Sequence, residues 1–243
     1  MSELAQRLTE TERERVHANL KPRDAATLIL IDRKGRTPKL LMGRRNPASV
    51  FMPGKFVFPG GRLDPDDRRM VAANALDATV EAKLHARVLR PTASRPRALA
   101  LAAIRETYEE TGLLLGRSDW GGPSGVPAAW SAFAERGVMP DLEMVHFIAR
   151  AITPPKRPRR FDARFFAVDA EAIAARVEDV TGPAAELVEL VWIPIKEARA
   201  LDLPTITGVV LEELEARLRA GFAPRLPVPF YHEQRRRWVR EEL

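Results

Sequence analysis

The chain has 243 residues, and the 45% that are hydrophobic suffice for one packed core in a domain of this length. It contains no cysteine, which excludes disulfide scaffolds, iron–sulfur clusters, all-cysteine zinc sites and cysteine nucleophiles. Lysine and arginine exceed aspartate and glutamate by 39 − 33 = 6, an excess that favours anionic partners such as phosphates.

No apolar run approaches the ~20 residues that span a bilayer. The chain is charged from Glu3 onward, unlike a secretory signal. We therefore expect no membrane partner and a cytoplasmic location.

The first part of the chain predicts a polar arm and then three short strands. The arm covers residues 1–23 and is predicted to be helical over 1–20. The apolar run at 25–32 and the segments at 39–44 and 55–58 predict strands, because each is short, apolar and bounded by Gly or Pro.

The clearest helix signal follows a long interval, residues 64–97, whose stretch 70–89 is amphipathic. A helix is predicted over 97–111, with Ser94 as its N-terminal cap and Gly112 just after its end. Its early part is apolar nearly all round, so we expect it to be buried on more than one side.

The second half predicts further strands and helices in no strict alternation, which favours an α/β or α+β domain with a mixed sheet. The predicted segments are strands at 143–153, 161–168 and 187–193, a basic turn at 154–160, helices at 170–180 and 206–220, and a C-terminal tail at 221–243. The standard dinucleotide and P-loop glycine patterns are absent from the sequence.

Three glutamates gather on one face of the predicted helix 97–111. At 3.6 residues per turn, Glu106, Glu109 and Glu110 fall within roughly 100° of arc. Their mutual repulsion is relieved by water or by cations, and clustered carboxylates suit Mg²⁺ or Mn²⁺. Arg105 lies one turn before Glu109 and can pair with it. The alternative is a solvated acidic face, which the apolar character of this helix disfavours.

The run Arg105-Glu-Thr-Tyr-Glu-Glu-Thr-Gly112, together with Phe58-Pro-Gly-Gly61 upstream, resembles the box of Nudix hydrolases. The resemblance covers roughly residues 24–203 and implies a Nudix-type α/β/α sandwich with a mixed sheet, here as one domain over 24–220. It also implies hydrolysis of a nucleoside diphosphate linked to another moiety. The family's roles, carried over by position, make Glu106, Glu109 and Glu110 ligands of Mg²⁺ or Mn²⁺, with the Gly61 carbonyl as a further ligand and Arg105 orienting the acids.

The interval from Gly61 to Arg105, 105 − 61 = 44 positions, is about 30 longer than in the family's box, so a helical insertion is expected at 64–97. The first glutamate of the box has no clear counterpart, and Asp64, Asp66 or Asp67 are candidates to replace it. The long insertion resembles a subgroup that includes coenzyme A diphosphatases. Segments 40–45 and 153–166 are also similar to that subgroup.

The resemblance also suggests a general base near the last predicted strand, with Glu186 as the first choice and Glu189 as the second. Glu110 is a further alternative, and Glu186 and Glu189 are about equally consistent with a plain solvent-facing role. Candidate phosphate contacts are the arginines Arg44, Arg45, Arg159, Arg160 and Arg164, because a guanidinium grips phosphate oxygens in a bidentate fork. For each arginine a surface role is at least as common.

The leading interpretation is a metal-dependent pyrophosphohydrolase acting on coenzyme A or acyl-CoA. ADP-ribose, dinucleotides or nucleoside triphosphates are alternative substrates, since pocket loops rather than the box choose among them. A non-catalytic domain that binds nucleotide or RNA is the alternative of another class. All three box acids are present, which favours catalysis, and only 7% of residues are aromatic, which does not favour a nucleic-acid partner. A partner-binding scaffold that uses the insertion is a third class, and a homodimer is common in the family.

Overall fold

A computed structural model describes residues 2–11 and 15–243. Part of the predicted helical arm, residues 1 and 12–14, lies outside the described residues. The strands are β1 (Arg23–Asp32), β2 (Lys39–Arg45), β3 (Phe56–Val57), β4 (Gly60–Arg62), β5 (Leu113–Leu115), β6 (His146–Ile152), β7 (Phe161–Asp169), β8 (Ile173–Arg176), β9 (Leu187–Pro194), β10 (Pro229–Gln234) and β11 (Arg237–Glu242). The helices are α1 (Glu3–Glu10), α2 (Ala78–His85), α3 (Ser94–Thr111), α4 (Ser131–Glu135), α5 (Ile195–Ala198) and α6 (Thr205–Ala220), with single 3₁₀ turns at Pro65–Arg68, Ala128–Trp130 and Ala170–Ala172.

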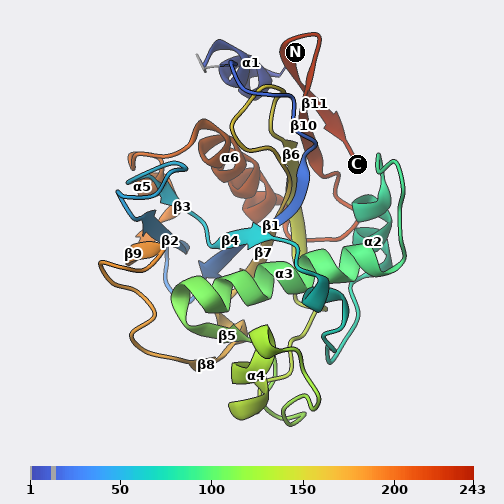
Figure 1. Cartoon of the computed structure of the whole chain (residues 1–243), viewed down its shortest axis with the longest axis vertical. Coiled ribbons are helices and arrows are strands. Elements are labelled where there is room, and N and C mark those ends of the chain that lie inside the picture. The colour runs from blue at the N-terminus through green and yellow to red at the C-terminus, as the bar shows by residue number, and fades with distance from the viewer. Residues whose placement is uncertain (1, 12–14) are drawn as a thin grey trace.

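One large mixed sheet forms the centre of the molecule (Figure 1), and its main path runs β11-β10-β6-β7-β1-β2-β3. The pairs β1–β7 and β6–β10 are parallel, whereas β1–β2, β6–β7 and β10–β11 are antiparallel. β4 pairs with β1, and β9 pairs with β2. A small second sheet joins β5 to β8.

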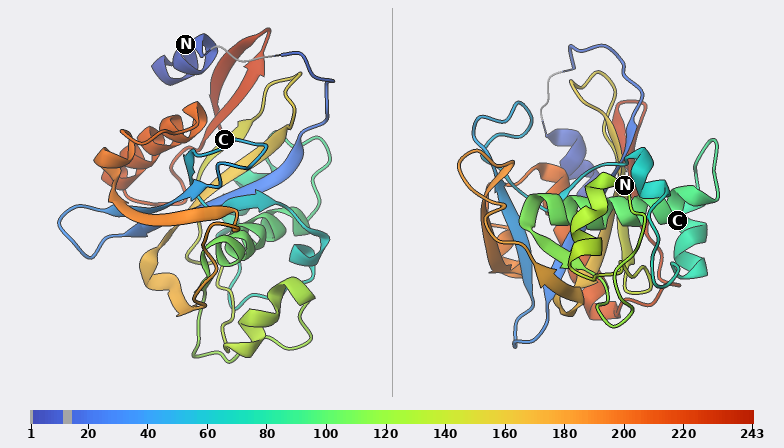
Figure 2. Two further views of the ribbon diagram at one scale, coloured as in Figure 1. Left: turned by 60° about the vertical axis from the view of Figure 1, so that its left-hand side comes forward. Right: turned by 60° about the horizontal axis from the view of Figure 1, so that its bottom comes forward.

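Helices cover both faces of this sheet. α3 packs on one face, where Leu28 and Leu30 of β1 share a core with Leu99, Leu101 and Ile104. On the other face, the second core contains residues of α6 and α1. The two views in Figure 2 show the sheet between these layers. The predicted α/β/α sandwich with a mixed sheet is therefore confirmed.

α3 is buried along most of its length, as its apolar early part predicts. Gly112 ends it in the left-handed conformation with φ 73°, where a side chain would meet the carbonyl of Val177. Its start differs from the prediction, because the N-terminal cap is Ala93 and Ser94 lies inside the first turn with no capping bond.

Two segments differ more from their predicted structure. Residues 170–180 were predicted to be helical, but one 3₁₀ turn is followed by β8, whose alternating half-buried and exposed residues pair with β5. Pairing with a distant strand here overrides the helix propensity of an alanine-rich run. Of the amphipathic stretch 70–89, only α2 is helical, and Asp77 caps its start.

Residues 229–242, which fall in the predicted C-terminal tail, form the hairpin β10–β11 and extend the sheet beside β6. Tyr231 and Trp238 of this hairpin are buried in the second core with Ala5 and Leu8 of α1. The two ends of the chain thus pack on each other. In the described part of the chain, none of the helices combines the length and hydropathy needed to cross a bilayer.

Candidate functional site

The predicted box residues meet where α3 passes β4. Arg105 is 5% exposed and stands at the centre of their contacts. Its guanidinium donates to both carboxylate oxygens of the fully buried Asp67, at 2.8 and 3.1 Å, and to the carbonyl of Arg62 at 2.9 Å. Asp67 is thus the aspartate, of the three considered, that bonds to Arg105. It follows Gly61 by six positions despite the long interval to the helix.

The same guanidinium also holds two of the three clustered glutamates. Nη1 of Arg105 lies 3.0 Å from Oε1 of Glu106 and 2.9 Å from Oε2 of Glu109. Glu106 packs directly on Gly61, because a Cβ built on this glycine would lie 2.3 Å from Oε2 of Glu106. Only glycine leaves room for that carboxylate, so Gly61 has a steric role whatever its carbonyl does.

Glu110 occupies a deeper position on the same helix. It is 6% exposed, and its Oε2 accepts the backbone N–H of Gly60 at 3.0 Å. Glu186, the residue before β9, is close enough to repel it electrostatically. The first-choice general base therefore lies beside the cluster, whereas Glu189 faces outward and pairs with Arg44.

These positions shift the pKa values of the acids. Burial raises the pKa of Glu106 to about 7; Arg105 opposes the rise and Glu109 adds to it. Burial, and then repulsion from Glu186, raise the pKa of Glu110 well above its ordinary value, against the hydrogen bond from Gly60. Although burial acts in the opposite sense, bonding to Asp67 and the charges around Arg105 raise the pKa of its guanidinium.

The residues present have the donor chemistry of a divalent-cation site. Within the part of the chain that the structure describes, no three acidic or imidazole side chains converge as a ready ligand set, because Glu106 and Glu109 pair with Arg105 and Glu110 with Gly60. The set nevertheless consists of hard carboxylate oxygens, which Mg²⁺ and Mn²⁺ prefer. Burial raises the pKa of both Glu106 and Glu110, and a cation bound beside them would favour their ionised forms.

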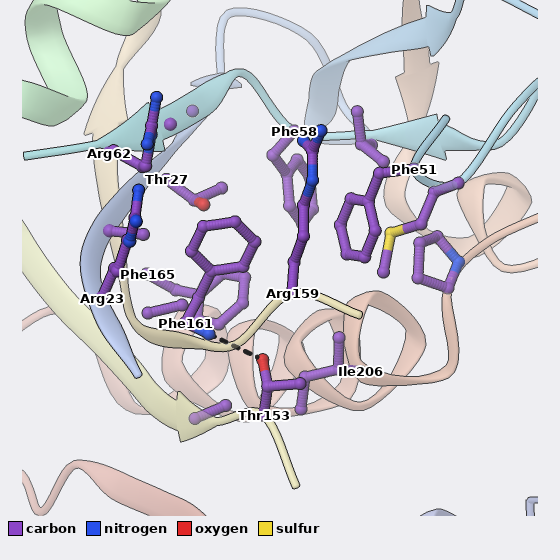
Figure 3. A pocket seen from close by; sticks show the side chains of 18 of the residues that line it. Arg23, Thr27, Phe51, Phe58, Arg62, Thr153, Arg159, Phe161, Phe165 and Ile206 are labelled. Atoms are coloured by element: carbon purple, nitrogen blue, oxygen red, sulfur yellow. Dashed lines mark hydrogen bonds between the residues drawn. The ribbon is translucent and has the colours of Figure 1, made fainter. Parts of the chain in front are cut away.

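A cavity of about 860 Å³ opens beside this cluster. Gly60, Gly61, Glu106 and Glu186 form one part of its lining. Another part is aromatic, as Figure 3 shows, and is made by Phe51, Phe58, Phe161 and Phe165. The rings of Phe51 and Phe161 meet edge to face with 6.0 Å between their centroids. The cavity thus joins a set of acids to a wall of phenyl rings.

Arginines complete the lining. Arg23, Arg62 and Arg159 reach the cavity (Figure 3), and none of the three has a carboxylate partner among residues 2–11 and 15–243. Arg159 was a sequence candidate, whereas Arg23 and Arg62 were not. The position of Arg62 directly after Gly61 is a signal that could have identified it.

Of the four candidate arginines other than Arg159, the structure places one at the cavity. Arg45 lines it and pairs with Glu186 at 3.0 Å. Arg44 is the next residue along the strand but is directed outward, toward Glu189 at 2.8 Å.

The other two arginines lie in structural contacts away from the cavity lining. Arg160 donates to the Thr153 carbonyl at 3.0 Å and to Asn19 at 2.9 Å, which ties the N-terminal arm to the turn before β7. Arg164 is fully buried between Asp24 and Asp162, at 2.9 and 3.1 Å. The sequence shows that they are arginines, but it does not show that Arg160 bonds to the N-terminal arm or that Arg164 is buried within β7.

Gly61→Ala is expected to reduce activity because the new methyl group would displace the Glu106 carboxylate. A shift of about 1 Å in a reacting group can cost about 10²-fold in rate. The matched control is Gly182→Ala, since a Cβ at Gly182 meets nothing within 4 Å. Steady-state kinetics of the two variants test this, and equal activity would show that the close packing at Gly61 is unimportant.

The metal-free protein is expected to lose stability as the pH rises from about 4.5 to about 7. The pKa of Glu106 in the folded protein is about 7 and its ordinary value is 4.5, so the folded state binds this proton more tightly than the unfolded chain. Melting curves in a chelator across this window should show the decline, and Glu106→Gln should flatten it. A melting temperature that climbs with pH in both proteins would contradict the assignment.

Comparison with known proteins agrees with this geometry. No protein-family model matches the chain. A Caenorhabditis elegans protein named "Putative nudix hydrolase 7" is 27% identical over 156 residues, which cover 59% of this chain and 43% of that protein. The chain therefore spans less than half the length of this curated relative. The crystal structure of a NUDIX hydrolase from Alicyclobacillus acidocaldarius aligns with a TM-score of 0.59 at 29% identity, over 81% of this chain and 92% of that one.

The chain is thus similar to Nudix hydrolases in both sequence and fold. The residues that resemble the Nudix box lie on β4 and on the second half of α3, and residues 63–93 lie between these two elements. Of the three aspartates considered for the place of the first box glutamate, Asp67 is the one that accepts hydrogen bonds from Arg105. The likenesses do not extend to a substrate.

Proposed function

We propose that this protein is a divalent-cation-dependent Nudix pyrophosphohydrolase. It would cleave the diphosphate bond of a nucleoside diphosphate linked to another moiety. The observation that carries the proposal is the set of three glutamates on α3 beside a cavity of about 860 Å³, with Glu106 and Glu109 bonded to Arg105 and Glu110 bonded to Gly60. A diphosphate needs only a small part of that volume, so the remainder suits a larger organic group.

The chemistry of the lining supports a nucleotide-like ligand. Arg23, Arg62 and Arg159 supply positive charge without carboxylate partners in the described chain, which suits phosphate oxygens. The phenyl rings of Phe51 and Phe161 supply an apolar wall on which a flat ring can pack. The protein's excess of six positive charges also attracts an anionic ligand, and it does so over a longer range.

Coenzyme A or acyl-CoA is the favoured substrate. The two segments that resemble the coenzyme A subgroup, 40–45 and 153–166, both contribute to the cavity, the first through Arg45 and the second through Thr153, Arg159 and Phe161. ADP-ribose and dinucleotides also carry a diphosphate and a base. They are equally compatible with this lining.

The residues would divide the work as follows. Glu106, Glu109 and Glu110, with the Gly61 carbonyl, would hold Mg²⁺ or Mn²⁺. The cations, when bound, neutralise charge on the diphosphate. Arg105 keeps two of these carboxylates in place on α3. Glu186, beside Glu110, would take the proton of the attacking water as general base.

A panel assay tests the proposal. Coenzyme A, acyl-CoA, ADP-ribose, NADH, diadenosine polyphosphates and nucleoside triphosphates would each be incubated with Mg²⁺ or Mn²⁺, and the products identified by mass. Cleavage within the diphosphate of at least one ligand, abolished by a chelator, is expected. A melting shift that needs nucleotide but no divalent cation, without turnover, would instead indicate a binding domain.

A further inference from the structure

A β-bulge next to the cavity separates two adjacent arginines. In the pairing of β2 with β9, Arg44 lies opposite Glu189 and Arg45 lies opposite Leu187, so the register skips Val188. A bulge of this kind redirects a side chain and is frequent beside functional sites. Here it leaves Arg44 on the outer surface and brings Arg45 to the cavity lining.

Arg45 joins two segments that are far apart in the sequence. Its side chain is 14% exposed, and its Nη1 lies 3.0 Å from Oε1 of Glu186. Its Nε donates to the carbonyl of Phe51 at 2.9 Å, and its backbone N–H donates to the carbonyl of Lys55 at 2.9 Å. The guanidinium of Arg45 therefore contacts both the candidate base and the loop that carries Phe51, one of the four phenyl rings of the cavity.

The neighbouring residue fixes the backbone of the same two segments. The N–H of Asn46 donates to the Glu186 carbonyl at 2.9 Å, and its side-chain amide donates to the Pro183 carbonyl at 2.8 Å. The backbone of Glu186 is thus held by Asn46, and its carboxylate is held by Arg45.

The carboxylate needs such a partner. The side chain of Glu186 is 55% exposed and faces repulsion from the buried Glu110. With water accessible on one side and a like charge on the other, an unpaired Glu186 would turn outward. Arg45 supplies the opposite charge on the cavity side.

We propose that Arg45 is a positioning residue, which holds Glu186 beside Glu110 and at the same time fixes the Phe51 wall of the cavity. The proposal rests on the proposed function. It implies that catalysis and substrate binding depend on the same guanidinium through different partners. Loss of Glu186 alone should therefore impair catalysis and leave substrate binding intact.

A kinetic cycle tests this, using the best ligand of the panel. Arg45→Ala is expected to lower kcat about 10²-fold, the size typical for losing a placed general base, and to raise KM. Glu186→Gln should lower kcat by a similar factor with KM unchanged. The double variant should show no further fall in kcat and the raised KM of Arg45→Ala.

Two further variants separate positioning from folding. Arg45→Lys keeps the charge but cannot reach both partners with one fork, so it should retain more kcat than Arg45→Ala while KM stays high. Guanidinium ion at low concentration should partly restore the kcat of Arg45→Ala. The control Arg117→Ala removes an exposed arginine that pairs with Asp119 at 2.7 Å, away from the cavity, and should change neither constant.

Independent, multiplicative losses of kcat in the double variant would overturn the proposal, as would wild-type kinetics for Arg45→Ala or Glu186→Gln. A crystal structure of Arg45→Ala adds a test that needs no turnover. We expect Glu186 turned to solvent and loop 46–55 displaced, and an unchanged site would overturn the proposal. Absence of hydrolysis of every ligand by the wild type would instead reject the proposed function.

Discussion

Replacing Glu106 by glutamine is expected to lower kcat/KM by about 10²-fold or more, the scale seen when one preorganised group that stabilises transition-state charge is removed. The carboxylate of Glu106 packs against Gly61, borders the cavity and lies 3.0 Å from Arg105. Glutamine has nearly the same shape, so the packing survives while one anionic ligand is lost.

The folded state should not suffer from this change. Burial raises the pKa of Glu106 to about 7, so its ionised form is held at a cost above that pH. A neutral amide removes the repulsion from Glu109 and Glu110. We therefore expect the melting temperature in a chelator at about pH 8 to equal or exceed that of the wild type.

Steady-state kinetics and metal titration measured together check this prediction. The activity of Glu106→Gln should fall while its affinity for Mn²⁺ falls as well. Glu135→Gln on α4 is the matched control, because Glu135 is exposed and lies outside the cavity lining. Full activity of Glu106→Gln would remove the acidic cluster from the mechanism.

The parts of the site that the sequence predicted are those encoded by local spacing. The helical face that carries Glu106, Glu109 and Glu110 follows from a 3.6-residue period, and the end of α3 follows from Gly112. Gly61 of β4 was identified because the run from Phe58 to Gly61 resembles part of the Nudix box. Each of these signals lies within a few residues of the feature that it predicts.

Features set by distant strand pairing could not be predicted in this way. β8 forms because β5 lies beside it, and an alanine-rich run of residues contains no sign of that neighbour. The bulge opposite Arg45 gives two adjacent arginines different surroundings, because one skipped residue turns a side chain to the other face of the sheet. Arg44 faces outward and Arg45 lines the cavity. Arg164 is buried because β7 pairs with β1 on one side and β6 on the other, between Asp24 and Asp162.

The candidate aspartate for the place of the first box glutamate lies between these cases. Its separation from Gly61 matches the expected count, yet Asp64, Asp66 and Asp67 were all candidates from the sequence. The 3₁₀ turn Pro65–Arg68 decides among them, because it buries Asp67 under Arg105 and leaves Asp66 to pair with Arg69 on the surface.

Asp67→Asn is accordingly expected to lower the free energy of unfolding by about 3 kcal/mol, the lower range for breaking one side of a buried ion pair. Asp67 is fully buried and accepts two hydrogen bonds from Arg105 and one from the N–H of Asp64. Asparagine keeps the volume but leaves the guanidinium without its buried counter-charge. The melting temperature should fall by about 10 °C.

The catalytic consequence separates this change from simple destabilisation. With Asp67 neutral, the Arg105 guanidinium is drawn more strongly to Glu106 and Glu109, the two carboxylates that it already contacts. Both would then be less available to a cation, so the apparent affinity for Mn²⁺ should fall even well below the melting temperature.

Asp66→Asn, the same substitution one residue earlier, is the control for stability. Among the residues that the structure describes, the Asp66 carboxylate forms an ion pair with Arg69 alone. The Arg69 side chain is 69% exposed, so loss of this pair should cost less than ~1 kcal/mol. Thermal denaturation and Mn²⁺ titration of both variants, followed by circular dichroism and calorimetry, give the comparison. If Asp67→Asn matched Asp66→Asn in both measurements, the buried pair with Arg105 would not be what holds the box together.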